Sequence, residues 1–430
     1  MKISVIGCGY VGLVSGVCFA DSGHTVTCID NDEKKIQLLK DNKVPIYEPG
    51  LDELLLKNVR QNNLRFDLNI NENIQDSEIV FIAVGTPTGE NGEANLSFIH
   101  QCANEIAEFI SPNTYIIIKS TVPVGTCDEV EDIISKKSKH SKFSVVSNPE
   151  FLREGNAIND FINPDRIVIG INDHKNREKM IDLYNNISSE DKILFTSRRS
   201  SELIKYASNS MLAMRIIFIN EIADLCEKVG ANVTDIAKGI GLDKRIGPYF
   251  LEPGPGFGGS CFPKDARALI ESGKKYDAPQ TLLESVILGN ENRKKNLSTK
   301  ILDKLDGHSE NQIGVLGVTF KAETDDMREA PSLTLIPDLQ NNGLSITVYD
   351  PQCKEASKLI QNVNWKNTAY EAAEDVDCLV ILTDWEEFKN LDLTKLKNKM
   401  KRPLIYDFRN IFDPVRMTEL GFEYFSVGRG

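Results

Sequence analysis

The chain has 430 residues, of which 41% are hydrophobic, and its 50 basic and 63 acidic side chains leave a net charge of -13. This length favours two or three domains, each able to bury a core of its own. The acidic charge disfavours nonspecific binding to nucleic acid or anionic membranes, so an anionic substrate needs a local basic pocket. Without a signal-peptide pattern or a run of about 20 apolar residues, the protein is expected to be cytoplasmic and free of membrane.

The cysteines and histidines narrow the chemistry further. Nine cysteines, an odd number without paired C-x-x-C spacing, argue against a disulfide framework and against structural zinc. Most of them are expected to be small buried residues. The five histidines show no metal-ligand spacing, so we expect no metal site.

The first half of the chain alternates β-rich runs with helical segments. This alternation predicts parallel βαβ units and a doubly wound sheet of about two hundred residues. The runs expected to form strands are 2–6, 25–30, 78–84, 115–120, 143–147, 166–170 and 192–196.

A long helix is expected from Ser200 to Val229, with Gly230 ending it. Its middle, 211–219, is apolar on nearly every face. Such a helix needs burial on all sides. We therefore expect it to join two domains and to form the core of a homodimer.

The last third of the chain repeats the strand pattern, at 313–320, 346–350, 378–383 and 404–406. This predicts a second doubly wound unit, although the turn after its first strand has no glycine triplet. The expected fold class is α/β, with two Rossmann-like doubly wound domains joined by a long central helix. The expected domains are 1–198, 199–305 and 306–430.

A glycine-rich loop, residues 7–12, follows the first strand and opens a helix. Gly7, Gly9 and Gly12 permit a tight turn and a close approach of the backbone to a pyrophosphate. Asp30 ends the next strand, where a carboxylate can accept hydrogen bonds from an adenosine ribose and would repel a 2'-phosphate. We therefore expect NAD, rather than NADP, as cofactor.

Two further strand ends are expected at the same carboxyl edge of the sheet. They carry Thr86, in 85–87, and Thr121, in 120–123. Ligands bind at this edge in doubly wound sheets. Turn chemistry that merely ends a strand is the alternative interpretation of both segments.

A second loop, residues 257–265, contains the one cysteine in a reactive setting. Pro263 suits the first turn of a helix, so Cys261 is expected at a helix N-terminus, where amide groups and Lys264 favour the thiolate. Asp265 lies one turn further on, where it could hold water or accept a proton. The alternatives are a small buried cysteine and an ordinary first-turn acid.

A nicotinamide enzyme with a nucleophilic thiol can oxidise an alcohol beyond the aldehyde. The thiol captures the aldehyde as a thiohemiacetal, a second oxidation produces a thioester, and water releases the acid. The cysteine loop therefore favours a four-electron oxidation.

Taken together, these residues resemble the UDP-glucose/GDP-mannose dehydrogenase family over nearly the whole chain. The resemblance implies oxidation of UDP-glucose to UDP-glucuronate with two NAD, or the same chemistry on GDP-mannose or a UDP-hexosamine. A hydroxyacid dehydrogenase that stops after one hydride and a non-catalytic NAD-binding sensor are more distant alternatives. The motifs are 9–13, Tyr47-Glu-Pro-Gly-Leu51, 85–88, 120–125, 148–155, 202–209, 257–265 and 317–321.

The resemblance also implies individual roles. It makes Cys261 the nucleophile and implies that Lys205 stabilises the charge that develops on the substrate oxygen. It assigns Glu150 to water activation and thioester hydrolysis, and makes Thr121 and Asp265 the residues that order this water.

Cofactor and substrate contacts follow from the loops and the resemblance. Arg245 is expected to reach the substrate from the neighbouring subunit. The cofactor-binding residues are Gly7, Gly9, Tyr10, Val11, Gly12, Asp30, Lys35, Thr86, Thr121, Glu154, Lys264 and Arg328. The substrate-binding residues are Glu150, Phe151, Leu152, Lys205, Asn209, Arg245, Phe250, Leu251, Gly258 and Lys321.

Overall fold

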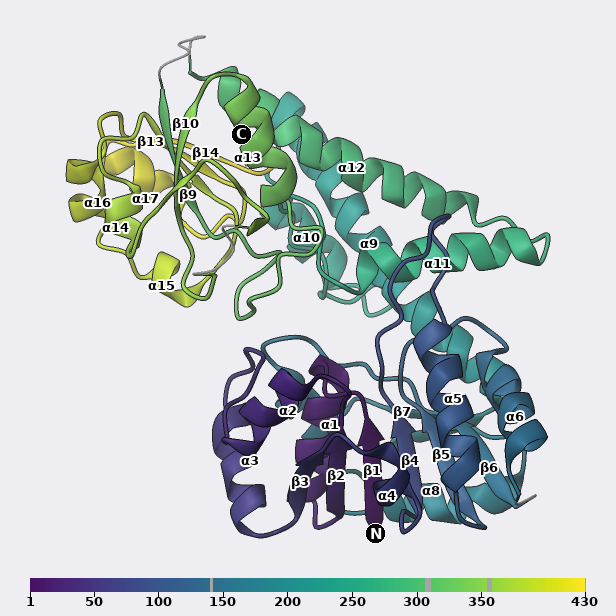
Figure 1. The fold of residues 1–430 in the computed structure, drawn as a ribbon. Helices are drawn as coiled ribbons and strands as arrows, with labels where there is room; N and C mark the ends of the chain where they lie inside the picture. The colour runs from purple at the N-terminus through teal and green to yellow at the C-terminus, as the bar shows by residue number, and fades with distance from the viewer. Residues whose placement is uncertain (140–141, 306–310, 354–357, 430) are drawn as a thin grey trace. The chain divides into compact units, whose positions relative to one another are not determined.

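The computed structural model describes residues 1–139, 142–305, 311–353 and 358–429, which form two compact units (Figure 1). The first unit comprises Met1–Ser208 with Arg267–Pro279, and the second comprises Asn209–Ala266 with the described residues from Gln280 onward. Each unit contains one sheet. None of the described helices combines the length and the apolar character that a bilayer crossing requires.

The sheet of the first unit has the strand order β3-β2-β1-β4-β5-β6-β7-β8. Neighbouring strands are parallel except β6 and β7, which meet in one antiparallel pair, Ser147 with Gly170. The strands are β1 (Lys2–Ile6), β2 (Thr25–Ile29), β3 (Leu64–Asp67), β4 (Ile79–Ile82), β5 (Thr114–Ile118), β6 (Phe143–Ser147), β7 (Ile167–Gly170) and β8 (Ile193–Thr196).

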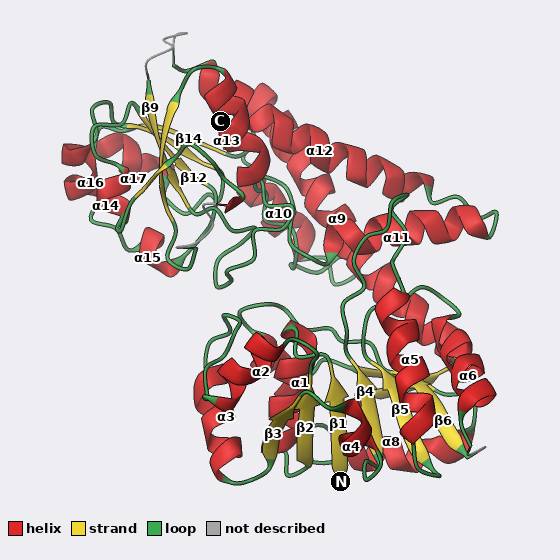
Figure 2. Cartoon of the chain, viewed as in Figure 1, coloured by secondary structure: helices red, strands yellow, loops and turns green. Residues whose placement is uncertain are grey.

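Helices cover both faces of this sheet, as Figure 2 shows. Because the parallel strands are apolar on both sides, each face has its own buried cluster. The helices are α1 (Tyr10–Asp21), α2 (Glu33–Lys40), α3 (Leu51–Arg60), α4 (Ile70–Ile74), α5 (Ser97–Phe109), α6 (Thr126–Lys137), α7 (Ala157–Ile162) and α8 (Arg177–Tyr184).

The second unit has an all-parallel sheet of order β11-β10-β9-β12-β13-β14. One buried cluster joins it to its helices. Its strands are β9 (Gln312–Leu316), β10 (Ser345–Tyr349), β11 (Asn364–Trp365), β12 (Cys378–Ile381), β13 (Leu404–Asp407) and β14 (Glu423–Ser426). Its sheet helices are α13 (Ser332–Asn341), α14 (Ala369–Ala372), α15 (Glu386–Lys389), α16 (Leu393–Lys399) and α17 (Pro414–Glu419).

Four helices lie between the two sheets in the sequence, and three of them are longer than any helix of the sheets. The expected long helix is confirmed as α9, and Gly230, with φ 71°, follows its last residue. These helices are α9 (Arg198–Val229), α10 (Val233–Gly241), α11 (Phe262–Lys275) and α12 (Thr281–Leu302).

The expected fold class, two doubly wound domains with a long central helix, is confirmed. The parallel βαβ pattern is wrong at β7, because the connection 148–166 contains only the six-residue α7 in place of a long crossover helix. The three-domain division stays a prediction, and its boundary at 306 lies outside the described residues.

Candidate active site

The glycine loop connects β1 to α1 in the first unit. Gly7 has φ 100°, and a Cβ at Gly12 would lie 1.8 Å from the carbonyl oxygen of Gly7. A Cβ at Gly9 would meet no atom within 4 Å. Packing therefore requires two of the glycines, whereas Gly9 leaves open space beside the start of a helix, as a pyrophosphate group needs.

Asp30 follows β2 and holds this loop in place. Its Oδ2 accepts hydrogen bonds from the Cys8 amide at 2.7 Å and from Lys35 Nζ at 2.9 Å, and its Oδ1 accepts one from the Asp32 amide at 3.0 Å. Burial raises the pKa of Asp30, but Lys35 and the two amides together lower it below its ordinary value. A charged carboxylate with a cation beside it thus faces the place where a ribose is expected.

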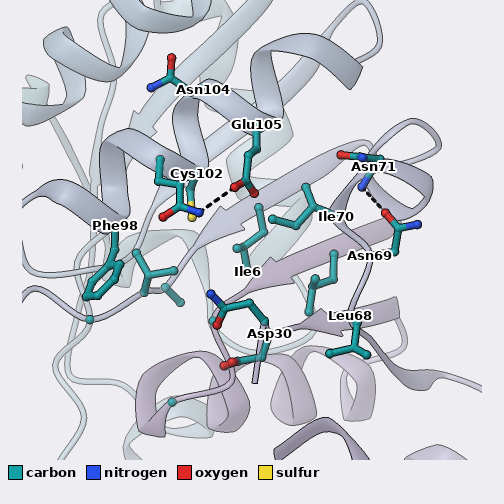
Figure 3. Close-up of a pocket in the computed structure, with 18 of the residues that line it drawn as sticks. Ile6, Asp30, Leu68, Asn69, Ile70, Asn71, Phe98, Cys102, Asn104 and Glu105 are labelled. Carbon is teal, nitrogen blue, oxygen red and sulfur yellow. Dashed lines mark hydrogen bonds between the residues drawn. The ribbon is translucent and has the colours of Figure 1, made fainter. Parts of the chain in front are cut away.

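Asp30 and Lys35 line a pocket of about 810 Å³. Figure 3 shows Asp30 at one side of it, with Leu68, Ile70 and Phe98 among the apolar side chains around the space. Apolar walls suit a planar base, and the carboxylate suits ribose hydroxyl groups. The pocket and the open glycine position therefore fit the adenosine and pyrophosphate of NAD.

Glu150 forms a buried ion pair beyond the end of β6. Its Oε1 lies 2.9 Å from Lys205 Nζ on α9, and both side chains are 4% exposed. Its Oε2 accepts the amide hydrogen of Leu152 at 2.5 Å. Burial raises the pKa of Glu150, but the charge and hydrogen bond of Lys205, the Leu152 amide and the charge of Lys119 lower it overall. Glu150 is therefore held as a charged carboxylate inside the protein.

Lys119 is a neighbouring cation that the sequence analysis did not single out. It directly follows β5 and is buried, and its Nζ donates to Asn148 Oδ1 at 3.2 Å and to the Asn148 carbonyl at 3.4 Å. A lysine at the end of the apolar run Tyr115–Ile118 was the available signal.

The loops after β4 and β5 are joined to each other. Thr86 Oγ1 donates a hydrogen bond to the carbonyl oxygen of Thr121 at 2.9 Å. The structure thereby brings these two predicted residues together at the carboxyl edge of the sheet. Their contacts with cofactor and water stay predictions.

Glu48, in the motif 47–51, has a structural part that the sequence analysis did not assign. Its buried carboxylate accepts the amide hydrogens of Gly155 and Ala157, each at 2.7 Å, and the hydroxyl hydrogen of Tyr10. The Gly155 amide also donates to the Tyr10 hydroxyl oxygen at 2.9 Å. Glu48 thus fastens the segment that carries Glu154 to the first residue of the glycine-loop helix.

In the second unit, Cys261 directly precedes α11, as expected. It is half-buried, whereas the other eight cysteines are buried, and the Ser260 hydroxyl lies 3.5 Å from its sulfur. This exposure separates Cys261 from the small buried cysteines of the core. Its assignment as the nucleophile stays a prediction.

Asp265 differs from an ordinary first-turn acid because it is almost fully buried. Asn209 Nδ2 and Lys264 Nζ each donate to its carboxylate at 2.6 Å, one to each oxygen. The structure therefore brings three predicted residues of the second unit together. Asn209 and Lys205 lie four residues apart on α9, which is one helical turn.

The loop before Cys261 is packed closely. A Cβ at Gly258 would lie 2.4 Å from the Glu329 carbonyl oxygen, and Gly259, with φ 81°, faces the ring of Phe320. Leu251 is buried, and the Phe250 and Phe262 rings are 6.1 Å apart. Glycine is thus required here by packing and backbone conformation.

Two arginines of the predicted site each form an ion pair with an aspartate two residues earlier in the sequence. Arg245 pairs with Asp243 at 2.6 Å, and Arg328 pairs with Asp326 at 2.8 Å. Both guanidinium-bearing side chains are exposed. Their contacts with substrate and cofactor, like that of Lys321 with substrate, stay predictions.

Three family models match this chain. They are the NAD binding domain (residues 1–188), the central domain (199–292) and the UDP binding domain (314–414) of the UDP-glucose/GDP-mannose dehydrogenase family. The first match confirms NAD as the cofactor.

Individual proteins are similar over the full length. The UDP-glucose 6-dehydrogenase of Rhizobium meliloti is 51% identical over 100% of both chains. A solved UDP-glucose dehydrogenase from Pyrobaculum islandicum is 34% identical with a TM-score of 0.91, covering 99% of this chain and 97% of the other. A solved UDP-D-ManNAc dehydrogenase from Pyrococcus horikoshii is 27% identical with a TM-score of 0.87, covering 100% of both. The chain therefore belongs to the UDP-glucose/GDP-mannose dehydrogenase family, whose members are oxidoreductases.

Proposed function

We propose that this chain oxidises UDP-glucose to UDP-glucuronate, consuming two NAD and one water and releasing two NADH and protons. The observation that carries the proposal is the half-buried Cys261 at the start of α11, set apart from the eight buried cysteines. The Rhizobium meliloti relative and the family's UDP binding domain support the choice of substrate.

Each group then has a defined task. NAD, when bound, supplies the hydride acceptor for both oxidations. Lys205 stabilises the charge that develops on the sugar oxygen as its proton leaves. The thiolate of Cys261 adds to the aldehyde carbon, which gives a thiohemiacetal and, after the second oxidation, a thioester.

Hydrolysis releases the product. Glu150 accepts a proton from water as the water oxygen bonds to the thioester carbon, and the carbon–sulfur bond breaks to return Cys261 as thiolate. Thr121 and Asp265 hold the water, and Asn209 holds Asp265 while contacting the sugar. The buried Glu150–Lys205 pair supports this assignment because it keeps Glu150 charged until the substrate oxygen engages Lys205.

The test combines stoichiometry with trapping. We expect two NADH for each UDP-glucose and no free aldehyde. Cys261→Ala should abolish acid formation, whereas Glu150→Gln should accumulate a sugar-nucleotide adduct on Cys261 that intact-protein mass spectrometry detects. One NADH per substrate, or an adduct on another cysteine, would contradict the proposal.

Another nucleotide sugar is the main alternative substrate, because the Pyrococcus horikoshii structure is that of an enzyme for a different sugar. A panel of UDP-glucose, GDP-mannose and UDP-hexosamines, assayed by NADH formation, separates them. UDP-glucose should give the highest kcat/KM.

We also infer a homodimer centred on α9. Its side chains Met211, Phe218 and Leu225, spaced by seven residues, are 55%, 51% and 57% exposed in the single chain. An apolar stripe of this kind supports burial by a second copy. A monomer in sedimentation at micromolar concentration would contradict this. A cytoplasmic location stays a prediction.

A further inference from the structure

Lys119 is a buried ammonium in the first unit that the proposed mechanism does not use. In the described part of the chain it donates only to neutral oxygens, both belonging to Asn148. Burying a cation against neutral acceptors costs free energy. A costly buried charge beside a reactive carboxylate is a common mark of a functional group.

Asn148 connects Lys119 to the reactive carboxylate. It lies two residues before Glu150, and its side chain is fixed on three sides. Its Nδ2 donates to the Val168 carbonyl at 2.9 Å, while its Oδ1 accepts from Lys119 and from the Tyr184 hydroxyl. Lys119 therefore acts on Glu150 in two ways, through the backbone that carries it and through its charge.

The charge matters because Glu150 has two buried cations to rely on, besides the partly buried Arg166, which also interacts with its charge. Lys205 pairs with it directly at 2.9 Å, and Lys119 lowers its pKa from a greater distance. In the proposed reaction, the ammonium of Lys205 serves the substrate oxygen, which becomes negatively charged again when water adds to the thioester carbon. The ion pair of Glu150 with Lys205 would then be weakened while Glu150 stays buried, and burial favours the protonated acid. A protonated acid cannot accept a proton from water.

We propose that Lys119 is a positioning residue for Glu150, a second buried ammonium that keeps this carboxylate charged while Lys205 serves the substrate. This inference rests on the proposed function, in which Glu150 accepts the proton of the hydrolytic water. It assigns Lys119 to thioester hydrolysis and to neither oxidation step.

The ionisation range of Lys119 suits this task. Burial lowers its pKa to about 8, while the charge of Glu150 opposes and that of Lys205 adds to this lowering. Lys119 is thus charged below about pH 8, the range in which a buried carboxylate needs a cation to stay ionised. Glu150 and Lys205 are the two charged groups that act on it.

The experiment compares variants that remove the charge with one that removes only a hydrogen bond. Lys119→Met removes both the charge and the hydrogen bond to Asn148. Lys119→Gln removes the charge but keeps a donor to Asn148. Tyr184→Phe, the matched control, removes a hydrogen bond to the same Asn148 oxygen and leaves the ammonium in place. NAD binding confirms that each variant is folded.

Two readouts are taken between about pH 4 and 9, a range that spans the ionisation of a carboxyl group and of Lys119. One is kcat, and the other is the fraction of Cys261 that carries a sugar-nucleotide adduct at steady state, from intact-protein mass. We expect both Lys119 variants to shift the acidic limb of the kcat–pH profile toward higher pH, by about one pH unit. The adduct should accumulate on the acidic side and disappear as the pH rises, whereas Tyr184→Phe should keep the wild-type profile.

The outcomes separate this inference from the proposed function. An unchanged acidic limb in both Lys119 variants, or the same shift in Tyr184→Phe, would overturn the role of the Lys119 charge. Glu150→Gln tests the underlying function by itself. If Glu150→Gln accumulates the adduct and the Lys119 variants do not respond to pH, only the present inference fails.

Discussion

In both sheets of this molecule, a glycine with positive φ follows the first strand and an aspartate follows the second. Gly7 and Asp30 occupy these places in the first unit, and Gly317 and Asp350 occupy them in the second. The two aspartates even make the same kind of bond, because each accepts an amide hydrogen from the loop after the first strand. The plan of the two edges is therefore shared.

The edges differ in what they leave open. Asp350 accepts the amide hydrogen of Val318 at 2.8 Å on one oxygen and those of Gln352 and Cys353 at 2.9 and 3.0 Å on the other. A Cβ at Gly317 would lie 1.7 Å from the Thr383 hydroxyl. This edge closes on itself, whereas Asp30 lines a pocket and Gly9 faces open space. The same strand plan thus gives a closed turn after the first strand in one sheet and an open turn, beside the cofactor pocket, in the other.

The effect expected to be largest distinguishes Gly12, where packing excludes a side chain, from Gly9, which faces open space. Gly12→Ala should lower the free energy of unfolding by about 3 kcal/mol, because its Cβ would overlap the Gly7 carbonyl. Gly9→Ala should change it by less than about 0.5 kcal/mol but weaken NAD binding at least about tenfold, since the methyl group enters the space for the pyrophosphate. Urea unfolding and NAD titration check this, and equal NAD affinity in Gly9→Ala and wild type would count against it.

Cofactor choice should depend on one aspartate alone. Asp30→Ala should narrow the preference for NAD over NADP in kcat/KM by about tenfold, or about 1.4 kcal/mol, because the charge that repels a 2'-phosphate is gone. Asp350→Ala should leave the preference unchanged and lower the free energy of unfolding by about 2 kcal/mol through its lost amide bonds. A comparable change of preference in both variants would contradict the comparison.

The first edge is also fastened by Glu48, and breaking this tie should have a smaller effect. Glu48→Gln should lower the free energy of unfolding by about 1–2 kcal/mol, because a charged acceptor of the Gly155 and Ala157 amides becomes neutral. Tyr10→Phe, which removes only the hydroxyl on the same carboxylate, should cost less. Equal losses in urea unfolding would mean that the Glu48 charge is unimportant.

The smallest expected effect is an opposite response to pH. The folded-state pKa of Asp30 is lowered, so its contribution to stability is present above about pH 4 and is lost below it. Burial raises the folded-state pKa of Asp407 in the second sheet, so its contribution is present below about pH 4 and is lost as the pH rises.

Urea unfolding between pH 3.5 and 7, roughly the carboxyl range, compares wild type with Asp30→Asn and Asp407→Asn. As the pH falls, wild type should lose stability relative to Asp30→Asn and gain it relative to Asp407→Asn. The same sign in both comparisons would show that the two aspartates experience similar surroundings.

The strands that sequence analysis missed have weak patterns. β3 is four residues long with only two of them buried, and β11 has only two residues, neither of them buried. β14 lies at the sheet edge with an exposed or partly exposed residue at each position. Edge strands bury little, so their apolar signal is weak. The central strands were found because both of their faces are covered, which makes their sequences apolar throughout.

In the candidate site, too, some residues were predictable from the local sequence and others were not. The positions of Cys261 at a helix start and of Gly7, Gly9 and Gly12 in a tight turn were predictable, because local backbone chemistry requires those residue types. The contribution of Glu48 was not, because its amide partners lie more than a hundred residues away in the chain.

By itself, the sequence determined the two doubly wound units, the long helix, the cofactor loop and the position of Cys261 before a helix, since each depends on periodicity or on neighbours within one turn. Only the tertiary structure decided that Glu150 pairs with Lys205, that the buried Lys119 binds Asn148, and that Asp350 closes its own loop. These outcomes depend on burial and on partners distant in the chain, and the charge of a buried group is set by its partners rather than by its own residue type.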